Sequence, residues 1–210
     1  MATASPNEAE LSPSRLDFQR ALEALDALLE ALDEGDWAQA RERFAEFEQI
    51  VRTLPAPDLE HPEMSFALMD FFHLYRVQLE RALLTEDATG AIFACNQLGD
   101  IMWDLRAQFE RAPVPELGRL HYLGRDLRYW SEVGDEKMVR LRALGVEKTW
   151  SDVRPIIAAS GEKALISRFD ELLERLHTAR TMEDYRAIAL MLEEAIHQLE
   201  AQFAREREPR

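Results

Sequence analysis

Apolar residues recur at helical spacing along most of this chain of 210 residues. Leu22, Leu25, Leu29 and Leu32, for example, fall on one face of a helix over about residues 13–34. The same spacing predicts helices over about 36–54, 62–85 and 90–111, and two more that carry apolar stripes over 165–176 and 185–203. Another helix is expected over about 116–132, and two shorter helices over 135–144 and 151–159 are bounded by Gly134, Gly145 and Gly161. No segment alternates β-branched and polar residues, so we expect no sheet.

Capping and turn residues mark where the helices begin and end. Asp36 is placed to cap the helix over 36–54, and Thr181 with Asp184 forms a capping box before the last helix. The fold class predicted is all-α, an antiparallel helical bundle of about eight or nine helices built from helical hairpins. Residues 62–85 are apolar on most sides, which predicts the most buried helix of the bundle. Gly118 and Gly124 permit close packing of the helix over 116–132.

A Pro-Val-Pro sequence at residues 113–115 divides the chain. It predicts a flexible arm over 1–12, an acidic four-helix bundle over 13–112, a C-terminal helical unit over 113–205 packed on that bundle, and a tail over 206–210. Since three residues make a turn and not a long linker, a single cooperative domain is the alternative.

The charge of the chain is negative and uneven. It has 25 basic and 40 acidic residues, of which 8 and 22 lie in residues 1–110. This composition argues against a nucleic-acid binder and favours a basic protein partner for the acidic N-terminal half. Cys95 is the only cysteine, expected to be buried and inert. We find no apolar run of membrane-spanning length and no leader, and therefore expect a cytoplasmic protein without a membrane span.

Motifs of several common enzyme classes are missing from the sequence. It contains no G-x-S-x-G nucleophile turn, no H-E-x-x-H zinc helix and no G-x-G-x-x-G dinucleotide turn. The leading prediction is therefore a non-enzymatic helical interaction protein, such as an adaptor, assembly factor or scaffold, without a cofactor. A homo-oligomer is compatible with this prediction.

Four of the five histidines follow a carboxylate by three residues. Such pairs share a helix face, and Glu-x-x-His is the ligand pair of di-iron bundles. His177 and His197, however, should differ by roughly 20 Å in height along the final helical hairpin, so they cannot share a metal. We expect the pairs Glu174/His177 and Glu194/His197 to be surface charge pairs.

The alternative prediction is a metal site in the N-terminal bundle. Asp70, His73, Asp100 and Asp104 would lie at similar heights on two helices joined near Asp87. Three carboxylates beside one imidazole require a neutralising cation, and this ligand set suits Mn, Fe or Zn. Arg76 or Arg106 could supply the charge instead, or the carboxylates could face solvent separately.

A basic and aromatic stretch offers a second candidate surface. Its central residues are Arg119, Arg125, Arg128, Tyr129 and Trp130. Arginine beside aromatic rings can bind phosphate or stack on bases, or it can meet a protein partner. The simplest interpretation is that these side chains cover a seam within the protein or form a solvated face.

Overall fold

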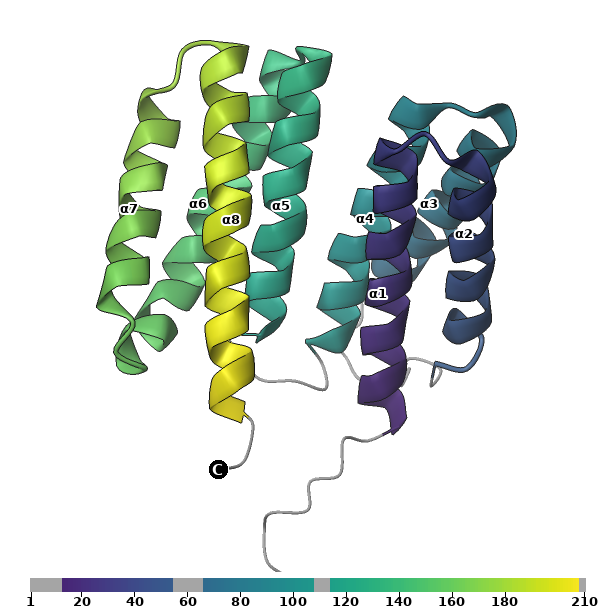
Figure 1. The fold of residues 1–210 in the computed structure, drawn as a ribbon, viewed down its shortest axis with the longest axis horizontal. Coiled ribbons are helices and arrows are strands. Elements are labelled where there is room, and N and C mark those ends of the chain that lie inside the picture. Colours follow the sequence, from purple (N-terminus) through teal and green to yellow (C-terminus); the bar gives the residue numbers. More distant parts are fainter. Residues whose placement is uncertain (1–12, 55–65, 108–113, 208–210) are drawn as a thin grey trace, which may run out of the picture. The chain divides into compact units, whose positions relative to one another are not determined.

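A computed structural model describes residues 13–54, 66–107 and 114–207 (Figure 1). These residues form eight helices and no strand, which confirms the all-α prediction. The helices are α1 (Pro13–Asp33), α2 (Trp37–Val51), α3 (Phe66–Thr85), α4 (Ala88–Arg106), α5 (Val114–Val133), α6 (Glu136–Ala159), α7 (Lys163–Thr178) and α8 (Met182–Arg207). The predicted arm over 1–12 and the end of the predicted tail, 208–210, lie outside the described residues.

The chain divides into two compact units, Met1–Leu98 and Gly99–Arg210, within helix α4. We call them the N-terminal and C-terminal units. The domain boundary near residue 112, which the Pro-Val-Pro sequence at 113–115 indicates, stays a prediction.

The N-terminal unit has a core of large side chains from its helices. Leu25 and Leu28 of α1 and Phe47 of α2 are fully buried. In α3, Leu79 is fully buried and Phe72 is 2% exposed. Helices α1 and α2 pack closely on each other.

Cys95 is buried in the N-terminal unit, as the sequence predicted. Its thiol donates a hydrogen bond to the Leu25 carbonyl oxygen at 3.5 Å, so the thiol ties α4 to α1. A buried thiol of this kind acts as a small apolar side chain.

The C-terminal unit has a second core built from α5, α6, α7 and α8. Helix α5 packs on α6 and α8, and α7 packs on the same two helices. At the centre of this core Trp150 and Phe169 stack with ring centroids 4.0 Å apart. Stacked aromatic rings bury a large apolar area in a fixed orientation.

The predicted caps are present. The Gln39 amide donates to the Asp36 carboxylate at 2.9 Å at the start of α2. Before α8, the Asp184 amide donates to the Thr181 hydroxyl at 3.1 Å, while the Thr181 amide donates to the Asp184 carboxylate at 3.0 Å. This reciprocal pair is the capping box predicted from sequence.

The prediction of two short helices over 135–144 and 151–159 is wrong, because both belong to the continuous helix α6. Gly145 lies inside α6, where a Cβ would come within 3.1 Å of a Leu123 methyl carbon. The glycine therefore allows close packing of α6 on α5 and does not end the helix. Pro155 is also accommodated within α6.

The prediction that residues 62–85 form the most buried helix is also wrong. Helix α3 buries Phe72 and Leu79 but exposes four large apolar side chains, Phe71, Leu74, Val77 and Leu84. A helix that is apolar all round can use only the face that meets its neighbours, and the other face of α3 is left in solvent.

Candidate functional site

The outer face of α3 carries a row of exposed apolar side chains. Leu74, Val77 and Leu84 are 46%, 63% and 73% exposed, and Phe71 lies at the edge of the row. We call these four residues the α3 stripe. Singly exposed apolar residues are common on proteins, whereas several on one helix face mark a surface that can bind another molecule.

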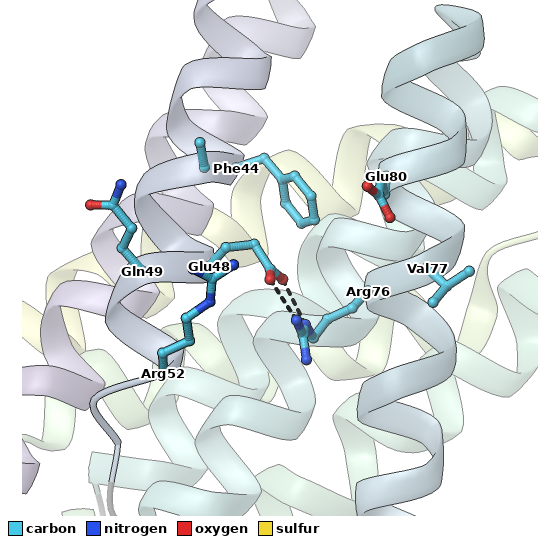
Figure 2. A pocket seen from close by; sticks show the side chains of 8 residues that line it. Phe44, Glu48, Gln49, Arg52, Arg76, Val77 and Glu80 are labelled. Carbon is cyan, nitrogen blue, oxygen red and sulfur yellow. Dashed lines mark hydrogen bonds and ion pairs between the residues drawn. The ribbon is translucent and has the colours of Figure 1, made fainter.

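A cavity of about 380 Å³ between α2 and α3 adjoins the stripe (Figure 2). Phe44 and Glu48 line it from α2, and Arg76, Val77 and Glu80 line it from α3. Arg76 donates to both carboxylate oxygens of Glu48, with a distance of 2.6 Å from Nε to Oε1. This bidentate ion pair fixes both side chains, and the charges of Arg76 and Glu48 neutralise each other.

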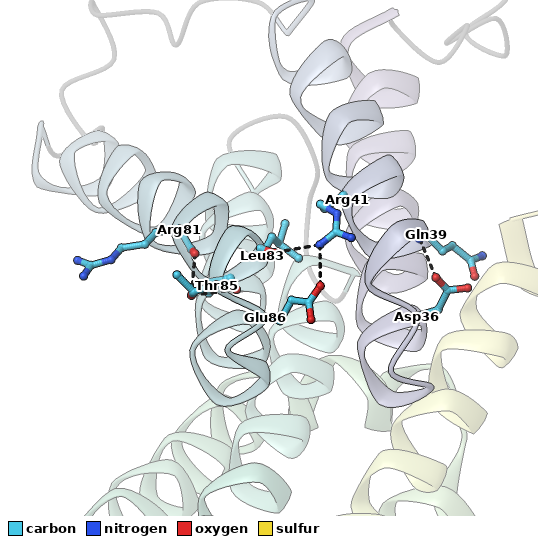
Figure 3. A network of polar contacts seen from close by, with 8 residues as sticks. Asp36, Gln39, Arg41, Arg81, Leu83, Thr85 and Glu86 are labelled. Carbon is cyan, nitrogen blue, oxygen red and sulfur yellow. Dashed lines mark hydrogen bonds and ion pairs between the residues drawn. The ribbon is translucent and has the colours of Figure 1, made fainter.

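A polar network holds α2 against the end of α3 (Figure 3). Arg41 donates to the Leu83 carbonyl oxygen at 3.3 Å and to the Glu86 carboxylate at 3.4 Å. Glu86 has a φ of 54°, a left-handed conformation that ends α3. Arg41 thus donates a hydrogen bond to one of the carbonyl groups that have no partner within the helix at its C-terminal end.

The four predicted metal ligands belong to two different units, two residues in each. Asp70 and His73 are exposed on α3 in the N-terminal unit. Asp100 and Asp104 belong to the C-terminal unit, where the Arg119 Nε lies 3.6 Å from an Asp100 oxygen and 3.3 Å from an Asp104 oxygen. A metal bound by all four residues stays a prediction.

Burial controls the ionisation of the second pair. It raises the pKa of Asp100 above its ordinary value, and Arg119 offsets this rise in part. Burial likewise raises the pKa of Asp104. Arg119 of α5 therefore supplies a cation beside both carboxylates, and Arg142 of α6 adds to the attraction at Asp100. The part of Arg76 or Arg106 in balancing this charge stays a prediction.

The basic and aromatic residues predicted as an interaction surface make contacts inside the C-terminal unit. Arg119 meets the two aspartates, Arg125 lies over the Tyr122 ring at 5.8 Å, and Arg128 lies 3.3 Å from Glu193. Tyr129 is buried, and the half-buried Trp130 packs edge-on against it and on the core. Their use by a partner remains a prediction.

The C-terminal unit also brings together His121 of α5 with His197 and Glu200 of α8. One potential ligand atom from each residue lies within 4.8 Å of the others, and no other such group occurs among the described residues. His121 is buried, His197 is exposed and Glu200 lies between these extremes. Two imidazoles and a carboxylate are a ligand set used for zinc.

Sequence reasoning missed this group. It treated Glu194 as the partner of His197, but the Glu194 carboxylate accepts from Arg168 at 2.9 Å. The residue three positions later, Glu200, is on the same helix face as His197. The missing element was His121, which is far away in sequence and reaches this face through the packing of α5 on α8.

Comparison with protein-family models, curated proteins and solved structures finds no match to this chain. Among the helices of the described residues, none is both long and apolar enough to cross a membrane.

Proposed function

We propose that this protein is a non-enzymatic interaction protein of the adaptor, assembly-factor or scaffold type, which binds a helix of a basic protein partner along the α3 stripe. The observation that carries the proposal is the exposure of Leu74, Val77 and Leu84 on one face of α3. We infer that consecutive helices pack as antiparallel hairpins and leave this face to the partner. A cytoplasmic location is part of the proposal, supported by the free thiol of Cys95.

The spacing of the stripe suits a second helix. From Leu74 the row continues to Val77, Arg81 and Leu84, in steps of three, four and three residues. These are the steps of the contact seam between two packed helices. An arginine at one seam position would favour a partner that offers an acidic or polar group there, which gives the contact a register.

The cavity beside the stripe adds a place for one apolar side chain of the partner. Val77 lies both in the stripe and on the wall of the cavity, with Phe44 on the opposite helix (Figure 2). Because the Arg76–Glu48 pair is internally satisfied, an apolar group can enter without leaving either charge unpaired.

Charge supports a basic partner. The sequence of the N-terminal unit, residues 1–98, has 7 basic and 19 acidic residues, a formal charge of −12. Exposed acidic side chains, among them Asp70 and Glu80, lie on α3 itself. Complementary charge accelerates association and excludes partners of like charge.

The test compares two charge substitutions of equally exposed leucines. Leu74→Asp places a carboxylate in the stripe, whereas the control Leu190→Asp changes a leucine of α8 that is 49% exposed. A partner recovered with the wild-type chain is identified, purified and titrated against each variant. We expect Leu74→Asp to weaken binding at least about tenfold, since one buried leucine contributes roughly 1.5–3 kcal/mol, and Leu190→Asp to leave it unchanged.

Two outcomes would contradict the proposal. Equal binding of the partner to both variants would place the interface elsewhere. A second copy of this chain is the other possible occupant. If light scattering shows a dimer that dissociates on Leu74→Asp substitution alone, the stripe is a self-association surface and not a site for a basic partner.

A further inference from the structure

The C-terminal unit contains a group of three side chains that the proposed function does not use. The His121 Nδ1 lies 3.6 Å from a Glu200 carboxylate oxygen, and the rings of His121 and His197 lie 4.8 Å apart between centroids. We propose that His121, His197 and Glu200 form a binding site for a divalent transition-metal ion of the zinc class.

The distances are close to those that a metal requires. Zinc bonds to nitrogen and oxygen are about 2.0–2.2 Å long, so tetrahedral ligand atoms lie roughly 3.3–3.6 Å apart. The pair His121 and Glu200 already has this separation, and the largest separation in the group is 4.8 Å. His197 is exposed, so rotation of its side chain can supply the remaining contraction without a change of the backbone.

A second observation comes from the buried ring of His121. Its Nε2 is buried and has no hydrogen-bond partner. A neutral imidazole has one nitrogen with a free electron pair, and a buried polar atom without a partner lowers stability. When the ring proton is on Nε2, the free electron pair is on Nδ1, which lies 3.6 Å from the Glu200 carboxylate and is the nitrogen that would bind the metal. The carboxylate would balance the charge of the ion.

The backbone that carries these residues is held by packing on both sides of the site. Leu120 of α5 and Ile196 and Leu199 of α8 are fully buried beside the three polar residues. Farther along the same two helices, Arg128 pairs with Glu193 at 3.3 Å and Arg186 pairs with Glu132 at 3.2 Å. Ligands on packed helices keep their spacing, which a metal site needs.

The ligand set defines the class of ion and the form of the site. Two nitrogen ligands and one oxygen ligand favour zinc, iron or nickel over Ca²⁺ and Mg²⁺, which prefer oxygen, and over Cu(I), which prefers sulfur. Three protein ligands leave a fourth position for water or another small ligand. Because His197 is exposed, that position can be reached from solvent.

The experiment titrates Zn²⁺ into the untagged, full-length protein by calorimetry, with Co²⁺ absorption as a spectroscopic check. We expect one Zn²⁺ per chain, a tetrahedral Co²⁺ spectrum and a higher melting temperature with Zn²⁺. His197→Gln, an exposed change that leaves the core intact, should weaken binding about 100-fold or more and remove the thermal shift. Glu200→Gln should also weaken binding. The control His177→Gln, at an exposed histidine of α7, should change neither property.

Other results would overturn the proposal. Absence of Zn²⁺ binding to the folded wild-type chain would show that the three residues form an ordinary polar cluster. Unchanged binding by His197→Gln would place the ion elsewhere. If Asp70→Asn with His73→Gln abolishes binding while His197→Gln does not, the metal lies at the site predicted from sequence in the N-terminal bundle.

Discussion

Two aspartates of the C-terminal unit, Asp100 and Asp170, have pKa values that their surroundings shift in opposite directions. Burial raises the pKa of Asp100, although Arg119 lies nearby. Hydrogen bonds from Arg154 and Trp150 outweigh burial at Asp170 and lower its pKa. The same carboxylate group is therefore destabilised as an anion at one position and stabilised at the other.

This difference predicts opposite pH dependence for two isosteric variants. A carboxyl with a raised pKa in the folded state costs stability when ionised, and that cost disappears as pH falls through the raised value. Asp100→Asn should therefore be more stable than wild type at neutral pH, by a margin that shrinks as pH falls toward about 4. Asp170→Asn should be less stable at neutral pH, and its deficit should shrink over the acid range in which Asp170 becomes protonated.

Urea unfolding of both variants across this pH range measures the two effects. Asp170→Asn serves as the internal control, since it is the same substitution in the same unit. Because Trp150 and Arg154 donate hydrogen bonds to Asp170, its stability at neutral pH should change in the opposite direction. A loss of stability at neutral pH in Asp100→Asn would show that attraction to Arg119 exceeds the cost of burying Asp100.

At the scale of elements, two glycines of α5 differ sharply in the space around them. A Cβ on Gly118 would lie 1.9 Å from the Trp103 ring, whereas a Cβ on Gly124 would have 3.4 Å to its nearest neighbour, in Glu193. Gly118→Ala should therefore lower the free energy of unfolding by about 1–3 kcal/mol through overpacking. Gly124→Ala should be neutral or gain up to about 1 kcal/mol from helix propensity.

Chemical denaturation of both variants tests whether Trp103 is held firmly against α5. The matched change at Gly124 removes the general effect of alanine in this helix from the comparison. Equal stability of the two variants would mean that the Trp103 ring moves aside at little cost, and that close approach at Gly118 is not needed for the unit to fold.

The helical elements were largely predictable because they depend on local patterns. The spacing of apolar residues predicted a helix over 13–34, where α1 spans Pro13–Asp33. The residue types at 181 and 184 predicted the Thr181–Asp184 capping box. The pattern failed at Gly145, which lies inside α6, where a Cβ would come within 3.1 Å of Leu123 of α5, a close approach that the sequence does not reveal. Helix propensity is a weak guide where packing of this kind decides.

Burial and the candidate sites were harder to predict. An apolar helix such as α3 does not reveal in its sequence how many of its faces have a neighbour, so the exposed Leu74 and Val77 were unexpected. The group of His121, His197 and Glu200 requires contact between α5 and α8, which are not consecutive along the chain. Single-sequence periodicity contains no information on such a pairing.

For the whole molecule, the open question is whether the two units unfold together. Each has its own buried core, with Leu28 in one and Leu192 in the other, and helix α4 crosses the boundary between the units, with Leu98 buried on one side of it and Met102 buried on the other. Separate cores allow local unfolding of one unit while the other stays folded. The shared helix is the element that would respond to a change in either core.

Two core truncations resolve this question by hydrogen exchange. Leu28→Ala and Leu192→Ala each remove a fully buried side chain and should cost about 2–5 kcal/mol. We expect each variant to lose amide protection in its own unit and in α4, while the core helices of the other unit keep theirs. A loss of similar size in both units from either substitution would instead show one cooperative domain. In that case a partner bound at the α3 stripe and a metal bound at His121 would stabilise each other's unit, because any ligand of the folded state stabilises everything that unfolds with it.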